Sequence, residues 1–368
     1  MGKHMNIHGI LRSMHFHDGS GRYIGHFKHC TLPCRGAHSQ WSKAVSAAEK
    51  VVGYPTSFMN LRFWLSDEMS NVAVNMRKLI GTKHPLMKTA KGLLFDNKEN
   101  MQTRGLVVLL MSKGAGHPKE SRNFLHHRLD NSYSDSNPMT ISNFNGSGIL
   151  STQRSLAEIT EMINTAFVIH KGVMDIDLNN KPKPYDSETA DLLYGNKMAI
   201  LSGDYLLAKA SSGLSSLGNT YVVESMASAI SDLMESSFFF VDRKDQKLDL
   251  DTWEQWSYKN GACLYAKSCQ SALMLSQHSA STSDQAFDFG RYFGLLRQLR
   301  TDYEGLEPHR DDSEAPSSSI YSVLSRSEIY ELKKEYTCKA TSCLSVLPHL
   351  EAKEALVNIL SAVSDNIF

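Results

Sequence analysis

The sequence predicts an all-α fold, a bundle of amphipathic helices, and two segments carry most of that prediction. Between Leu156 and Asp177, apolar residues recur at steps of three and four, which places them on one stripe of a continuous helix. They are Leu156, Ile159, Met162, Ile163, Ala166, Phe167 and Ile169. A second stripe with the same period runs from Phe58 to Leu79 and stops before Gly81, a typical helix terminator. Because each stripe must face a core, we expect the helices to pack against one another.

The composition is that of an ordinary globular chain, and it narrows the possible functions. The chain has 368 residues, of which 41% are hydrophobic and 21% are charged, with a formal net charge of zero. This length suits one large or two average domains, and a balanced charge without a basic tract argues against nucleic acid as a partner. No run of about 18 apolar residues occurs, so no bilayer-spanning helix is predicted. Six cysteines at irregular spacing are typical of reduced thiols in an intracellular protein.

Residues 1–50 differ from the rest of the chain because they are basic and poor in acids. Their two acidic residues are Asp18 and Glu49, and they lack a continuous apolar segment. Their seven basic residues are Lys3, Arg12, Arg22, Lys28, Arg35, Lys43 and Lys50. This composition favours a mitochondrial transit peptide over a secretory signal, with a disordered or cytosolic tail as the alternative. Residues 51–368 are then expected to form a single all-α domain.

Three further segments complete the predicted domain. Residues 119–150 are rich in Asn, Ser, His and Gly, so we expect a polar insert without regular structure. The run from Tyr221 to Met234 is apolar enough to continue the helical bundle. The last segment, from Ile329 onward, predicts two helices that are separated at Pro348.

The segment Gly195 to Ala208, GNKMAILSGDYLLA, is dense in a recognisable pattern. It resembles a helix of the trans-polyprenyl diphosphate synthases that reads GNxLAxLxGDxLLA, and the resemblance extends from Phe58 to the C-terminus. It implies the helical bundle of the isoprenoid synthases, arranged around a central cavity. Asp204 in this segment is expected to be a buried structural carboxylate, with a supporting role at a phosphate site as the alternative.

The helix before that segment carries, in the same family, the first Asp-rich motif DDxxD. Aligned on His170, the two leading aspartates become Lys171 and Gly172, and Asp175 alone remains of the three carboxylates. In the family these carboxylates hold Mg²⁺ ions that bridge the diphosphate of an allylic substrate. Lys171 places a cation where an anion should meet the metal, and such a charge pair about 4 Å apart is worth roughly 4 kcal/mol at an effective dielectric of about 20. Lys171 could instead contact a phosphate directly.

The basic residues that bind the second substrate, isopentenyl diphosphate, in this family are also mostly replaced. The segment Gln102 to Gly116 resembles GGKRxRPxLVLLAAxAxG, whose Lys and two Arg bind the diphosphate. Aligned on LVVLL, Met101 and Gln102 replace the Lys and the first Arg, and Arg104 alone remains. Losing two charge-assisted contacts should remove most of the affinity. Arg104 is therefore a remnant phosphate contact or, alternatively, part of a surface or interface salt bridge.

Two later segments show the same loss. One resembles KTAxLxAxSCxAxxxL, but the family's substrate-binding Lys and Thr are Asn260 and Gly261 here. The second Asp-rich motif, FGLxFQxxDDxxD, appears as FGLLRQLRTDYEG, in which Gln298 is kept and Arg297 replaces Phe. Asp302 alone remains of its three aspartates, so Gln298 and Asp302 are expected to be remnants of the substrate and metal sites.

The resemblance therefore covers the scaffold, whereas both metal sites and both phosphate grips are eroded. It implies the degenerate, non-catalytic subunit of a heteromeric all-trans-polyprenyl (decaprenyl) diphosphate synthase, which makes the side chain of ubiquinone. It also implies a catalytic partner subunit with intact DDxxD motifs that holds the Mg²⁺, assembled as a heterotetramer. We expect no catalytic residue, metal or other cofactor in this chain. In this family the first long helices, here Phe58 to Leu79, form the subunit interface.

The same reading predicts a mitochondrial protein, located in the matrix or in peripheral contact with the inner membrane. Two alternative functions stay open. The first is a prenyltransferase that retains activity alone, with Asp175, Asp302 and Glu304 holding fewer metal ions. The second is a homo-oligomeric module that binds a lipid in its helical cavity.

Overall fold

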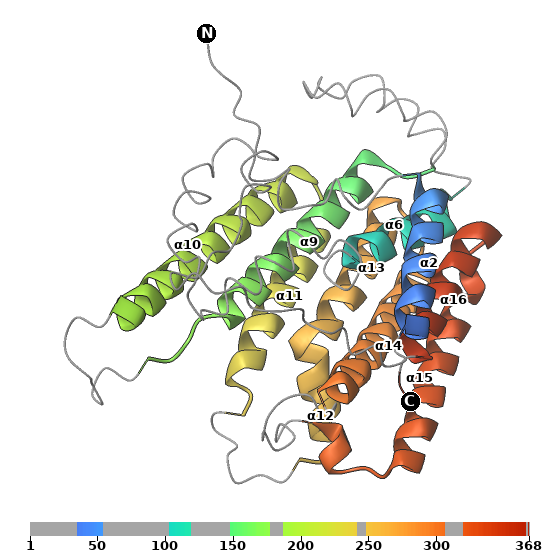
Figure 1. Ribbon diagram of the computed structural model, residues 1–368. Helices are drawn as coiled ribbons and strands as arrows, with labels where there is room; N and C mark the ends of the chain where they lie inside the picture. Colours follow the sequence, from blue (N-terminus) through green and yellow to red (C-terminus); the bar gives the residue numbers. More distant parts are fainter. Residues whose placement is uncertain are drawn as a thin grey trace, which may run out of the picture. The chain divides into compact units, whose positions relative to one another are not determined.

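The computed structural model describes residues 35–53, 103–118, 148–176, 187–240, 248–305, 319–365 and 367. From Gly36 onward these residues belong to one compact unit, Gly36–Phe368, and they form helices and no strand (Figure 1). The α-helices are α2 (Arg35–Val52), α6 (Thr103–Ala115), α9 (Ser151–Lys171), α10 (Ser187–Ser216), α11 (Thr220–Phe238), α12 (Leu250–Ser257), α13 (Cys263–Leu275), α14 (Ala280–Glu304), α15 (Arg326–Cys343) and α16 (Leu350–Ser364). A π-helix, η4 (Tyr258–Ala262), joins α12 to α13, and the short 3-10 helices are η5 (Ile320–Ser322) and η6 (Leu344–Val346). The predicted all-α fold is confirmed.

Helix α9 carries the apolar stripe predicted for it. All seven stripe residues, from Leu156 to Ile169, are buried. The helix ends at Lys171 because Gly172 forms its C-cap, and residues 173–176 are not helical. The prediction that this helix continues to Asp177 is therefore wrong, and Asp175 lies beyond the helix end.

Helix α14 crosses α13 and the end of η4 so closely that the contact tolerates no side chain on two glycines of α14. A Cβ atom on Gly290 would lie 2.5 Å from the backbone oxygen of Tyr265, and one on Gly294 would lie 2.4 Å from the Cα of Ala262. The rings of Tyr265 and Phe293 meet edge to face beside this crossing, with their centroids 5.0 Å apart. The crossing also brings η4 against α14, and the candidate site lies beside this contact.

Helix α10 contains the segment that most resembles the synthase family, and it packs mainly against α9 (Figure 1). Gly203 lies where the two helices meet, because a Cβ atom there would be 2.1 Å from Nε2 of His170. Position 203 must therefore be a glycine, because any side chain there would collide with the imidazole ring of His170. The apolar run Tyr221 to Met234 falls within α11, as predicted.

Helix α2 belongs to the folded unit, although its basic composition predicts that it is part of the leader. Trp41, Ala48 and Val52 are buried, and Lys113 of α6 donates a hydrogen bond to the carbonyl oxygen of Val51. The compact unit begins at Gly36, so the structure differs from the boundary expected at residue 50. The reason is that three apolar residues at helical spacing bury one face of an otherwise basic segment.

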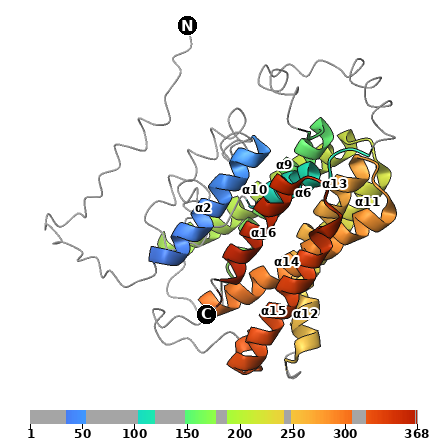
Figure 2. The same ribbon diagram turned by 90° about the vertical axis from the view of Figure 1, so that its right-hand side faces the viewer.

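The C-terminal region forms the two helices expected from the sequence. Helix α15 begins with a capping box in which the backbone N–H of Ser325 donates to Glu328 at 2.8 Å. It ends before η6, and α16 begins after Pro348. Figure 2 shows α14, α15 and α16 side by side, in agreement with Figure 1.

Some of the sequence predictions fall on other parts of the chain. The predicted helix from Phe58 to Leu79 and most of the polar insert, residues 119–150, lie outside the described residues. Within the part of the chain that the structure describes, no helix combines the length and the apolar character needed to cross a bilayer.

Candidate functional site

Residues from both eroded motifs meet where α9, η4 and α14 converge. Lys171, at the end of α9, donates a hydrogen bond to Oδ1 of Asn260 at 2.5 Å. Asn260 Nδ2 donates to Oε1 of Gln298 at 2.9 Å, and Gln298 Nε2 donates to Oδ1 of Asp302 at 2.7 Å. Trp253 of α12 completes the chain, because its indole N–H donates to Oδ2 of Asp302 at 2.9 Å. We call these five residues, Lys171, Asn260, Gln298, Asp302 and Trp253, the polar network.

The π-helix η4 gives Asn260 its position in this network. An i to i+5 turn shifts the register of a helix, and such bulges are frequent at functional sites. At Gly261 the backbone leaves helical geometry, with a φ of 172° and a ψ of −26°. Lys259, one residue before Asn260, forms an ion pair with Glu235 of α11 instead. A lysine next to the family's substrate-binding position is therefore turned away from the network.

Asp302 uses both of its carboxylate oxygens within the protein. Oδ1 accepts from Gln298, and Oδ2 accepts from Trp253 and from the backbone N–H of Ile320 at 3.2 Å. Trp253 is completely buried, so this carboxylate holds α12, α14 and η5 together in the interior. Burial is the largest influence on Asp302 and raises its pKa above the usual value. The hydrogen bonds of Asp302 therefore connect α12, α14 and η5, which is a structural role.

The residues present do not fit a Mg²⁺ cluster. Mg²⁺ demands near-octahedral oxygen coordination and is held by carboxylates and phosphates. Asp302 is one carboxylate, and its two oxygens already accept three hydrogen bonds from the protein. Lys171 stands where the alignment places the first aspartate. In the described ranges, no three His, Cys, Asp or Glu side chains are grouped closely enough to hold a metal ion. No chemical step through a metal follows from this site.

Asp175 is not part of the polar network. It is exposed in the segment after α9, beside Met174, whose backbone N–H and C=O both bond to the side chain of Asn196 at 2.8 and 2.7 Å. Lys171 also contacts a residue of its own helix, because its ammonium lies 4.7 Å from the ring centroid of Phe167. Partial loss of hydration lowers the pKa of Lys171.

The prediction of a buried carboxylate at Asp204 is wrong. Its side chain is 62% exposed, and Oδ1 lies 3.3 Å from Nε2 of His170. The reason is that Gly203, and not Asp204, occupies the buried position of α10 that faces α9.

Arg104, the remnant of the second phosphate grip, faces the interior. Its guanidinium carbon lies 4.8 Å from the ring centroid of Tyr265, a cation–π contact. Its neighbour Gly105 donates a backbone hydrogen bond to Oε1 of Glu161 at 2.8 Å. Burial raises the pKa of Glu161 to about 7, although the nearby charge of Arg104 and the backbone hydrogen bonds lower it. Arg104 therefore lies beside a buried acid rather than a surface partner.

Arg297, which stands where the family has Phe, lies beside the N-terminal helix of the unit. The guanidinium carbons of Arg297 and Arg300 are each 5.6 Å from the ring centroid of Trp41. Arg300 also pairs with Glu304 at 2.6 Å. Desolvation lowers the pKa of Arg297, and the like charge of Arg104 lowers it further. Cationic side chains from α6 and α14 thus occupy neighbouring positions.

Sequence reasoning missed several residues of this region. Trp41, Glu161, Trp253 and Tyr265 all make contacts that support the site, and none of them was singled out. Glu161 carried a usable signal, because it is an acid between the apolar residues Ile159 and Met162 of a buried helix. The pairing of Trp253 with Asp302 carried none, since the two residues lie 49 positions apart.

Comparison with known proteins agrees with this architecture. A family model described as Polyprenyl synthetase matches residues 102–314. All trans-polyprenyl-diphosphate synthase PDSS2 of Rattus norvegicus is 41% identical over 288 residues, which are 77% of this chain and 66% of that protein. The probable mitochondrial hexaprenyl pyrophosphate synthase of Neurospora crassa is 34% identical over 301 residues, covering 72% of this chain and 65% of that protein. The chain thus spans just under two thirds of the length of these relatives.

A solved structure gives the same fold. The decaprenyl diphosphate synthase from Rhodobacter capsulatus superposes with a TM-score of 0.54 at 16% identity, and the match covers 90% of this chain and 100% of that one. At this level of identity the similarity concerns the helical fold alone.

Proposed function

Because the chain belongs to the polyprenyl synthetase family, we propose that it is the non-catalytic subunit of a heteromeric all-trans-polyprenyl diphosphate synthase. Its partner would carry intact DDxxD motifs, bind Mg²⁺ and add isopentenyl diphosphate units to build the side chain of ubiquinone. The two chains would assemble as a heterotetramer. The observation that carries this proposal is the occupation of both Asp302 oxygens by Trp253, Gln298 and Ile320.

The energetics of the polar network support an inactive site. Oδ2 of Asp302 already accepts two hydrogen bonds, from Trp253 and Ile320, so a metal ion bound to this oxygen would displace at least one of them. The indole N–H of Trp253 is in a completely buried residue, and leaving such a donor unpaired costs about 1–3 kcal/mol. Lys171 adds repulsion against any dication placed nearby. A substrate–metal complex would therefore have to displace interactions that stabilise the folded chain.

An exposed apolar face of α10 suits a subunit contact. Leu193, Ile200 and Leu201 are 45%, 45% and 52% exposed, and their spacing of seven and eight residues places them on one face of the helix. Val173, which follows the end of α9, is 38% exposed. Large apolar side chains that are exposed together on one helix face are typical of interaction sites. We propose that the catalytic subunit packs here. The first helices, expected at the interface, lie outside the described residues.

We also propose that the protein acts in the mitochondrion. The Neurospora crassa relative is described as mitochondrial, and the first 34 residues of this chain are basic and poor in acids. This composition is typical of a transit peptide. Placement in the matrix, or in peripheral contact with the inner membrane, stays a prediction.

Co-expression tests the proposal. The chain alone and the chain with a DDxxD-bearing homologue are purified and supplied with farnesyl diphosphate, isopentenyl diphosphate and Mg²⁺. We expect elongation by the pair and none by the chain alone. Elongation by the chain alone would favour the residually active enzyme. Polyprenyl species that co-purify with the chain alone, seen by mass spectrometry, would favour the lipid-binding module.

Two surface variants test the contact. The double substitution Ile200→Asp with Leu201→Asp places charge on the outer face of α10 and should abolish co-purification of the partner. Tyr330→Asp changes an equally exposed apolar residue, 54% exposed, on α15 and should leave co-purification unchanged. If the α10 variant still co-purifies with the partner, the interface does not lie on this face of α10.

A further inference from the structure

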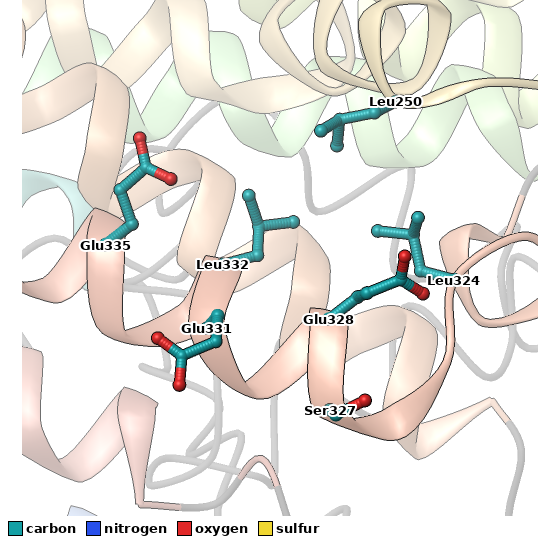
Figure 3. A pocket seen from close by; sticks show the side chains of 7 residues that line it. All are labelled: Leu250, Leu324, Ser327, Glu328, Glu331, Leu332 and Glu335. Carbon is teal, nitrogen blue, oxygen red and sulfur yellow. The ribbon is translucent and has the colours of Figure 1, made fainter.

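A groove between α12 and the start of α15 takes no part in the function proposed above. It has a volume of about 450 Å³ and is lined by residues of three segments (Figure 3). Its floor is apolar, because Leu250 begins α12, Leu324 precedes α15 and Leu332 projects from α15. Figure 3 shows Leu324 and Leu332 pointing toward Leu250. A hollow of this size accepts one or two large apolar side chains.

The rim of the groove is acidic along one face of α15. Glu328, Glu331 and Glu335 all line it and all are exposed. Glu328 and Glu335 are seven residues apart, which is about 10 Å along a helix. Figure 3 shows them on either side of Leu332, with Glu331 on the outer lip. The leucine floor is thus bracketed by two carboxylates and flanked by a third.

We propose that this groove, lined by Leu250, Leu324, Leu332 and the three glutamates, docks a short basic amphipathic helix of another protein. Charge complementarity selects this occupant. The leucines alone would accept any apolar segment, but three carboxylates around them disfavour acidic peptides and anionic lipid surfaces. A helix with basic residues seven positions apart and apolar residues between them has the matching spacing.

The carboxylates are available to such a partner. Glu335 pairs with Lys339 one turn further along the same exposed helix face, an interaction that contributes little to stability. Glu328 bonds to Ser325 at the helix start, and these hydrogen bonds hold the pKa of Glu328 below its usual value. Glu331 has no hydrogen-bonding partner among the residues that the structure describes. These exposed carboxylates can therefore accept cations from a partner without leaving a buried group unpaired.

Peptide titration against the full-length chain tests this inference. The probe is a fluorescein-labelled synthetic helix with Lys at positions i and i+7 and Leu at i+3 and i+4, followed by fluorescence anisotropy. A scrambled peptide of identical composition is the control. We expect saturable binding of the ordered peptide that weakens as salt is raised from about 50 to about 200 mM, because the rim charges are exposed and are screened by salt.

Matched variants locate the site. Glu335→Lys should weaken binding by about fivefold or more, because a rim attraction becomes a repulsion. Glu354→Lys makes the same charge change on an exposed position of α16 and should leave the affinity unchanged. Leu250→Gln should weaken binding at low and high salt alike, because it removes part of the apolar floor. Circular dichroism verifies that each variant is folded.

Equal affinity for the ordered and scrambled peptides, unchanged affinity of the Glu335→Lys variant, or absence of saturable binding would each overturn the inference. Concentration-dependent self-association that Glu335→Lys abolishes would identify a second copy of this chain as the occupant, and it would overturn the inference as well. None of these results bears on the co-expression test, so the two proposals fail independently.

Discussion

The crossing of α13 and α14 and the polar network lie at neighbouring places in the molecule, yet they are built on different requirements. At the crossing, Gly290 and Gly294 bring two backbones within a distance that excludes even a methyl group. At the network, Lys171 and Asn260 stand where the resemblance expects a metal ligand and a substrate contact, and they bond to each other. The residues of the crossing are therefore determined by close packing. The residues of the network are determined by a different requirement, which is that each buried polar group has a hydrogen-bonding partner.

The largest effect should come from removing part of the scaffold. A chain without residues 1–34 keeps α2, whereas a chain without residues 1–50 loses the buried Trp41 and Ala48. Losing one buried Trp side chain costs about 3–5 kcal/mol. We expect the shorter deletion to retain the thermal unfolding midpoint of the full chain and the longer one to lower it by about 4–7 °C. Equal midpoints in circular dichroism would show that α2 is dispensable.

A smaller but still severe effect is expected from Gly294→Ala. The new methyl group would meet the Cα and Cβ of Ala262 at 2.4 Å, so the helices must separate. Overpacking should lower the free energy of unfolding by about 1–3 kcal/mol or more. The higher helix propensity of Ala offsets about 1 kcal/mol of this loss at most.

Gly213→Ala is the matched control for that substitution. It lies in α10, where the nearest atoms are the flexible end of Ile159 at 3.1 Å. Urea unfolding should show a clear loss of stability for the first variant and little change for the second. Equal stability of the two would contradict the close crossing.

Breaking the network should cost about as much as the substitution at the crossing. Asp302→Ala leaves the buried indole N–H of Trp253 and the backbone N–H of Ile320 without an acceptor, for a loss of about 2 kcal/mol. Asp302→Asn keeps an acceptor oxygen and should lose less than half of that. A metal ligand would behave differently, because both variants would then lose any stabilisation by Mg²⁺. Unfolding curves with and without Mg²⁺ distinguish the two roles.

The smallest effect concerns Glu161, whose pKa of about 7 in the folded chain exceeds its usual value of 4.5. Because the pKa is raised by folding, its stabilising contribution is complete below about pH 4.5 and is lost as the pH rises through about 7. Between about pH 6 and pH 8 the loss should be about 1.4 kcal/mol. Glu161→Gln should remove this dependence, whereas Glu354→Gln, at an exposed position, should preserve it. An unchanged pH profile in the Glu161 variant would place the titration elsewhere.

Much of the fold could be predicted from the sequence, because helical periodicity records which face of each helix is buried. The stripe of α9 followed from the spacing of its apolar residues, and the break between the last two helices followed from Pro348. The basic composition of residues 1–50 misled the prediction of the domain start, since an average over fifty residues hides Trp41, Ala48 and Val52 on one helix face. Local periodicity was the better signal there.

The site was predicted only in part. Alignment to the family motifs indicated which side chains had replaced metal and phosphate ligands, and Lys171, Gln298 and Asp302 do meet in space. Their pairing depends on the π-helix that positions Asn260 and on Trp253, which are tertiary features without a short-range pattern. The expected burial of Asp204 failed because one residue along a helix rotates the side chain by about 100°, which turns Asp204 away from the face that buries Gly203.

Isothermal titration of the purified chain with a bisphosphonate, in the presence and absence of Mg²⁺, tests the central claim most directly. A homologue with intact DDxxD motifs serves as the positive control. If the polar network has replaced the metal site, the homologue should show saturable, Mg²⁺-dependent heat and this chain should show none. Saturable Mg²⁺-dependent binding by this chain, lost in the Asp302→Asn variant, would contradict the account.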